Sequence, residues 1–73
     1  MKIEKQLGMR ISYLRKKMGL SQLDLALEAG INRNYLSDLE RGMRNPTLSV
    51  LNKLAKALKI NLSTLLLGIE DFN

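Results

Sequence analysis

The sequence contains no cysteine, no histidine and no tryptophan. Without cysteine or histidine, disulfide bonds, metal sites built on thiolate or imidazole ligands, and catalysis by either side chain are excluded. Aromatic residues make up only 4% of the chain, so leucine must fill the core, which suits helices better than sheets. No run of about 18 apolar residues occurs, and the N-terminus lacks the apolar segment of a secretory signal. The expected location is therefore cytoplasmic, with no membrane partner.

Length and charge narrow the class of protein further. A chain of 73 residues forms one domain at most, so residues 1–73 are expected to be a single domain. A domain of this size buries only roughly 60% of its unfolded surface, and it is marginally stable unless it packs well or oligomerises. The 12 Lys and Arg against 7 Asp and Glu give a net charge of +5. That charge is typical of nucleic-acid-binding proteins, although a basic soluble protein fits it equally well.

Apolar side chains recur every three or four residues, which predicts five short helices and no sheet. The first helix is expected over residues 4–18, before Gly19. Its apolar stripe consists of Ile3, Leu7, Ile11, Leu14 and Met18. A fourth helix is expected after a Thr47 cap, and a short last helix over residues 62–67 after an Asn61 cap. The fourth stripe consists of Leu48, Leu51, Leu54, Ala55 and Leu58.

The second and third helices are expected to form a helix-turn-helix. Ser21 and Asn32 are N-cap residues for them, and Gly30 and Gly42 end them. Only a short glycine turn, with Ile31 tucked beneath it, separates the two helices. Their inward residues are Leu25, Ala26, Ala29, Leu36 and Leu39. The fold class is therefore all-α, a compact five-helix bundle.

Several fragments, taken in order and spacing, resemble the Cro and phage-repressor helix-turn-helix family, also called the XRE family. They are Leu20-Ser21-Gln22, Leu25-Ala26, Ala29-Gly30-Ile31, Tyr35-Leu36-Ser37, Leu39-Glu40-Arg41-Gly42, Arg44-Asn45-Pro46-Thr47 and Leu54-Ala55-Lys56-Ala57-Leu58. The resemblance covers roughly residues 7–67 and implies a lambda-repressor-like fold whose third helix enters the DNA major groove. Residues 32–35 and the pair Arg44 and Asn45 also resemble the controller proteins of restriction–modification systems.

The resemblance implies a recognition helix over about residues 33–41, with base contacts from its first turns. Arg33 suits guanine and Asn34 suits adenine, with Ser37 and Asp38 one turn further along the same face. Asp38 either accepts from cytosine N4 or pairs with Arg41 or Arg33. The alternative is that Arg33 and Asn34 are simply surface residues in the first turn of the helix, beside its N-cap.

Four further residues are expected to contact phosphates: Gln22, Tyr35, Arg44 and Asn45. Gln22 opens the second helix, and helix N-termini suit anions. The Tyr35 hydroxyl reaches a phosphate, its ring packs half-buried on the second helix, or both. Arg44 is a bidentate phosphate ligand or a solvated surface side chain. The resemblance also implies a structural salt bridge between Arg15 and Glu40.

Two groups of apolar residues belong neither to the predicted core nor to the predicted DNA-binding residues. The C-terminal end carries more apolar side chains than a short helix can bury, which predicts a homodimer interface of Leu66, Leu67, Ile69 and Phe72. The alternative is a monomer with Phe72 folded onto the first helix. Leu23 and Leu27 lie on the second helix where polar residues are expected. They are an exposed patch, a partner surface or a widening of the core.

Together these features predict a transcription regulator that binds a palindromic operator in double-stranded DNA as a homodimer. The alternative is a protein-interaction module of the same fold that acts through Leu23 and Leu27. No enzyme activity is expected, because no acid–base pair and no glycine-rich phosphate loop is present. No cofactor, metal or small-molecule ligand is expected either. No sensor domain is expected, so regulation is expected from concentration, a partner chain or operator layout.

Overall fold

The computed structural model describes residues 2–70 and has five α-helices and no strand within them. The helices are α1 (Ile3–Lys17), α2 (Gln22–Ala29), α3 (Arg33–Glu40), α4 (Leu48–Ala57) and α5 (Leu62–Leu65). The predicted all-α, five-helix architecture is confirmed. The last helix is shorter than predicted, because the chain leaves it in a turn at residues 66–68, where Gly68 has a φ of +78°. No helix among residues 2–70 is long and apolar enough to cross a membrane.

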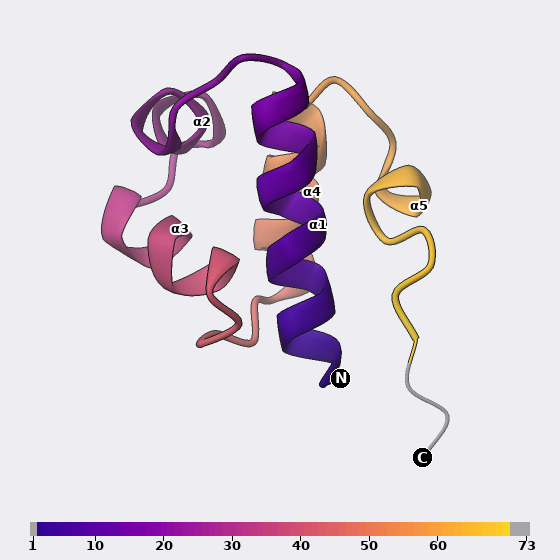
Figure 1. Cartoon of the computed structure of the whole chain (residues 1–73). Coiled ribbons are helices and arrows are strands. Elements are labelled where there is room, and N and C mark those ends of the chain that lie inside the picture. The colour runs from indigo at the N-terminus through magenta and orange to yellow at the C-terminus, as the bar shows by residue number, and fades with distance from the viewer. Residues whose placement is uncertain (1, 71–73) are drawn as a thin grey trace.

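The helices surround a single core, with α1 running through the middle of the molecule. Figure 1 shows α2 and α3 on one side of α1 and α5 on the other, with α4 behind. α1 packs against α3, α2 packs against both α3 and α4, and α4 packs against α5. The pair α2 and α3 therefore forms one edge of the bundle.

The core is built almost entirely of leucine and alanine, as the scarcity of aromatic residues predicts. Its buried members are Leu7, Ile11, Leu25, Ala26, Ala29, Leu36, Leu39, Leu54, Ala55, Leu58 and Leu65. The ends of two predicted stripes are wrong, since Ile3, Met18 and Leu48 are exposed. Ile3 and Leu48 are the first residues of α1 and α4, and Met18 follows the last residue of α1.

Four helices begin at the N-cap residues that the sequence predicts. The side chains of Ser21, Asn32, Thr47 and Asn61 each accept a hydrogen bond from the backbone N–H three residues further on. Asp24 completes a capping box by accepting from the Ser21 N–H at 3.0 Å, and this bond lowers the pKa of the Asp24 carboxyl. Caps of this kind contribute about 1 kcal/mol each, which matters in so small a domain.

Candidate nucleic-acid interface

The helix-turn-helix has a rigid base and a polar outer face. Gly30 ends α2 in the left-handed conformation, with φ +69°, and the Ile31 N–H donates to the Ala26 carbonyl at 3.0 Å. Leu36 and Leu39 are fully buried, so one side of α3 is fixed against the core. The opposite side of α3 therefore presents its polar residues to solvent.

All four predicted base-contacting residues lie on this face. Arg33 and Asn34 are exposed in the first turn, and Ser37 and Asp38 are half-exposed one turn later. The Arg33 guanidinium donates to the Asn34 side-chain oxygen at 3.4 Å, a long bond that leaves both side chains able to reach outward. The structure thus brings these residues together at the open edge of the bundle.

Asp38 pairs with two arginines. Its Oδ1 lies 2.5 Å from Arg41 Nη2, and its Oδ2 lies 3.3 Å from Arg44 Nη2. The pairing of Asp38 with Arg41 is one of the predicted alternatives. The second partner is Arg44 and not Arg33, the other residue that the sequence predicts. Hydrogen bonds from Arg41 and then from Arg44 lower the pKa of the Asp38 carboxyl.

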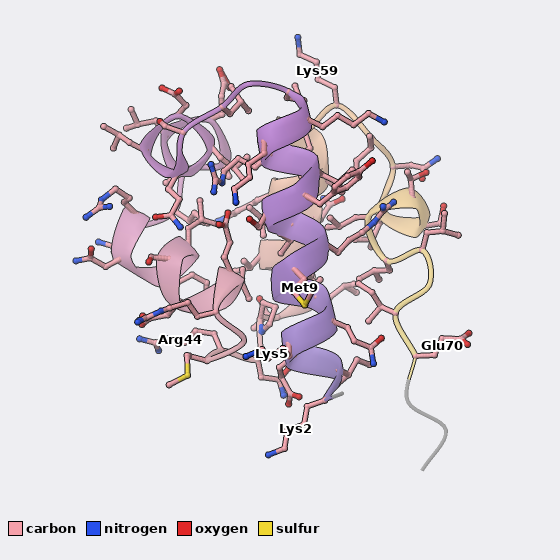
Figure 2. All side chains as sticks on the ribbon, viewed as in Figure 1. Lys2, Lys5, Met9, Arg44, Lys59 and Glu70 are labelled. Carbon is pink, nitrogen blue, oxygen red and sulfur yellow. The ribbon has the colours of Figure 1, made fainter. Side chains whose placement is uncertain are left out.

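Of the four predicted phosphate-contacting residues, Tyr35 lies within α3, Gln22 begins α2, and Arg44 and Asn45 follow α3. Arg44 and Asn45 are exposed in the loop that follows it, and Figure 2 shows the Arg44 side chain below α3, on the side away from α2. The Arg44 guanidinium carbon lies 5.3 Å from the centre of the Tyr35 ring, a cation–π contact. The Tyr35 ring is half-buried against the core, which agrees with the half-burial that one alternative predicts. Gln22 is half-buried at the start of α2.

The predicted salt bridge between Arg15 and Glu40 is present and nearly buried. Arg15 Nε donates to Glu40 Oε2 at 2.7 Å, and Arg15 Nη2 donates to Glu40 Oε1 at 3.0 Å. The guanidinium also donates to the Leu20 carbonyl at 2.8 Å. Hydrogen bonding to Glu40 raises the pKa of Arg15 despite the opposing effect of burial. This network ties α1 to the last residue of α3.

Gln22 joins the same network, which the sequence analysis did not predict. Its amide nitrogen donates to Glu40 Oε1 at 3.1 Å. Glu40 therefore holds the first turn of α2 and the last turn of α1 at once. In the DNA-free protein, Glu40 orients the Gln22 amide. A contact between Gln22 and a DNA phosphate stays a prediction.

Two glycines allow α1 to approach α3 and the loop after it closely, which was not predicted, although Gly42 was predicted to end its helix. A Cβ atom on Gly8 would lie 2.5 Å from the carbonyl oxygens of both Leu39 and Glu40. A Cβ atom on Gly42 would lie 2.9 Å from the Lys5 Cα. Glycine in the middle of a helical pattern is the signal that could have revealed Gly8, because such a residue usually marks close packing.

The predicted dimer residues differ in their exposure. Leu66 and Ile69 are half-buried and line an apolar groove of about 250 Å³ with Leu7, Leu51 and Pro46 among others. Leu67 is 68% exposed. Phe72 lies outside the described residues.

Side-chain hydrogen bonds from α1 hold the segment that carries these residues. Arg10 donates to the Thr64 carbonyl at 2.8 Å, and Gln6 bonds to both backbone groups of Glu70. The segment is thereby fixed against α1, with Leu67 pointing into solvent.

Leu23 and Leu27, the second predicted apolar surface, are 52% and 72% exposed on α2. They are therefore surface residues and do not widen the core, so that alternative is wrong.

Comparison with known proteins gives the same fold with recognisable sequence similarity. The model of a family described as Helix-turn-helix, HTH_3, matches residues 11–65. The chain is 45% identical over 58 residues to the immunity repressor protein of Bacillus phage phi105, covering 80% of this chain and 40% of that protein. It is 40% identical over 60 residues to control protein C.BamHI of Bacillus amyloliquefaciens, covering 81% and 74%.

The structure is similar to that of the restriction–modification controller protein C.AhdI from Aeromonas hydrophila, with a TM-score of 0.83 and 42% identity. That match covers 85% of this chain and 94% of the other. Among the curated relatives, this chain spans only 40% of the phage repressor and 55% of the SinR regulator of Bacillus subtilis.

Proposed function

Because this chain belongs to the HTH_3 helix-turn-helix family, as its Cro and phage-repressor motifs indicate, we propose that it binds double-stranded DNA through α3 and regulates transcription. The observation that carries the proposal is the outer face of α3, where Arg33, Asn34 and Ser37 are accessible on a helix anchored by buried leucines. The relatives are named as repressors, control proteins and transcriptional regulators, and none of those described above is named as an enzyme.

The proposed complex places α3 in the major groove. Arg33 donates to guanine O6 and N7 and Asn34 pairs with adenine, while Ser37 faces the next base pair and Asp38 lies beside it, paired with Arg41 and Arg44. Gln22, Tyr35, Arg44 and Asn45 contact the phosphates on either side of the groove. The half-buried Tyr35 ring leaves its hydroxyl group for this role, and the exposed Arg44 guanidinium can grip a phosphate with two hydrogen bonds.

Selection of bound sites from random double-stranded DNA, followed by titration at increasing salt, tests this function. Each phosphate contact should make the slope of log K against log salt steeper by about 0.9. A selected consensus with a steep slope supports the proposal. No enriched site together with a flat slope would favour the rival function, a protein-interaction module using the exposed Leu23 and Leu27 on α2.

The finer proposal is a homodimer on a palindromic operator. Two recognition helices read one face of the duplex when they lie about 34–36 Å apart. The Cα atoms of one chain extend 35 × 23 × 22 Å, so a second copy packed beside the first supplies that spacing. We assign the interface to Leu66, Leu67 and Ile69, with Phe72 next to them in the sequence, because the fixed segment exposes an apolar side chain beside an apolar groove.

Leu67→Asp should convert the dimer to a folded monomer, since the side chain is exposed and the charge would be buried only in the dimer. Binding to a full palindrome should weaken, while binding to a half-site should not. Sedimentation measures the oligomeric state, and circular dichroism shows whether the variant is folded. The matched control is Leu27→Asp, which changes a similarly exposed leucine on α2. This variant should remain dimeric. Monomers from the control, or a wild type that is monomeric at high micromolar concentration, would overturn this interface.

A further inference from the structure

Four side chains at the end of α3 form a connected surface group, which we call the Asp38 cluster: Tyr35, Asp38, Arg41 and Arg44. Asp38 contacts Arg41 through Oδ1, and it contacts Arg44 through Oδ2, which accepts from Arg44 Nε at 3.4 Å and from Nη2 at 3.3 Å. The Arg44 guanidinium also covers the Tyr35 ring. Each oxygen of the Asp38 carboxylate therefore has an arginine partner in the DNA-free protein.

The backbone builds this cluster. The Gly42 N–H donates to the Leu39 carbonyl at 3.0 Å, and the Met43 N–H donates to the Asp38 carbonyl at 2.9 Å. Gly42 has φ +78°, so the chain reverses in the glycine-ended turn typical of helix C-termini. The reversal returns Arg44 to the level of Asp38 and Tyr35, one helical turn back along α3.

A carboxylate that accepts from a guanidinium uses the same donors that a DNA phosphate would use. Both arginines are more than half exposed, so water and phosphate can compete for them. When the protein lies on DNA in any other register, a phosphate must displace Asp38 from the arginines before it can bind them. A phosphate that meets Arg44 where the cluster already holds it gains from preorganisation.

We propose that Asp38 is a specificity-determining residue that acts through Arg41 and Arg44, holding both guanidinium groups in place and lowering their attraction for DNA outside the correct register. The inference rests on the proposed DNA-binding function and adds to it a role for Asp38 other than a base contact. Asp38 is a positioning residue in this account, and Arg41 and Arg44 are the groups that reach the phosphates.

The test measures dissociation constants for the selected duplex and for a shuffled duplex of the same composition. Asp38→Asn keeps the shape of the side chain and removes its charge. Binding to the shuffled duplex should tighten about three- to tenfold, the size expected for two released surface pairs. Binding to the selected duplex should change about twofold or less, so the ratio of specific to non-specific affinity falls.

Two comparisons separate this mechanism from simpler ones. In an Arg41→Gln, Arg44→Gln background, Asp38→Asn should leave the shuffled-duplex affinity unchanged, because the groups it restrains are gone. Glu28→Gln removes one exposed carboxylate from α2 and should change that affinity less than about twofold. An Asp38→Asn effect that persists in the double background, or that Glu28→Gln equals, would show general charge repulsion and overturn the inference.

A third result would point to base reading. If Asp38→Asn weakens binding to the selected duplex and relaxes the preference at one base pair, Asp38 contacts a base and the inference is wrong. Failure of the wild type to bind either duplex would instead overturn the proposed function, and this inference with it. Binding by the wild type with an unchanged affinity ratio in Asp38→Asn would overturn this inference alone.

Discussion

Glu40→Ala is expected to lower the free energy of unfolding by about 3–5 kcal/mol, the usual cost of stranding a buried charge. The Arg15 and Glu40 side chains are only 10% and 6% exposed. Without the carboxylate, the guanidinium keeps its bond to the Leu20 carbonyl, and the Gln22 amide loses its bond to Glu40. A domain of this length has a total stability of about 4–11 kcal/mol, so the loss is a large share of it.

Urea denaturation and thermal melting measure this loss, with about 4–8 °C expected for each kcal/mol. Glu28→Ala, an exposed carboxylate on α2, is the control and should change stability by less than about 0.5 kcal/mol. Replacing both partners, as Arg15→Met with Glu40→Leu, should recover most of the stability, because no charge is then left unpaired. A Glu40→Ala melt that equals the wild type would show that the pair contributes nothing.

Gly8→Ala is expected to destabilise the fold by about 2–3 kcal/mol, even though alanine is the better helix former. The new methyl group would meet two carbonyl oxygens at the end of α3, both backbone atoms that no rotamer change can move aside. α1 must therefore move away from α3, which also strains the bond between Arg15 and Glu40.

The matching control is Met9→Ala, at the next position of α1, where the side chain is exposed. Equilibrium unfolding should show Met9→Ala within about 0.5 kcal/mol of wild type and Gly8→Ala well below it. DNA affinity of the folded Gly8→Ala fraction should also fall, because the recognition helix is displaced. Stability gained by Gly8→Ala, as helix propensity alone predicts, would contradict the close approach of the two helices.

Local signals in the sequence predict much of this fold. Ser21, Asn32 and Thr47 cap their helices because a short polar side chain satisfies a backbone N–H that the helix leaves free. Gly30 and Gly42 adopt the left-handed conformation that ends a helix. Such effects depend only on neighbours in the chain, so they can be derived from the sequence without a three-dimensional structure.

Features that depend on distant contacts could not be derived in the same way. The apolar ends of the stripes, Met18 and Leu48, are exposed, and this exposure depends on how the helices pack. The choice of Arg44 over Arg33 as a partner of Asp38 depends on how the turn at Gly42 returns the chain. Similarly, Gln22 meets Glu40 only because α2 and α3 pack together. The roles of the outer residues of α3 toward DNA remain predictions.

The most direct test of the central claim is the affinity of wild type and Arg33→Ala for the selected operator and its single-base-pair variants. Lys53→Ala, which removes an exposed charge from α4, is the control. If α3 reads DNA through Arg33, the variant should lose about 1–3 kcal/mol on the operator and its preference at one base pair should disappear. If Arg33→Ala instead binds the operator as tightly as the wild type and keeps the same base preference, the claim that α3 reads DNA through Arg33 is contradicted.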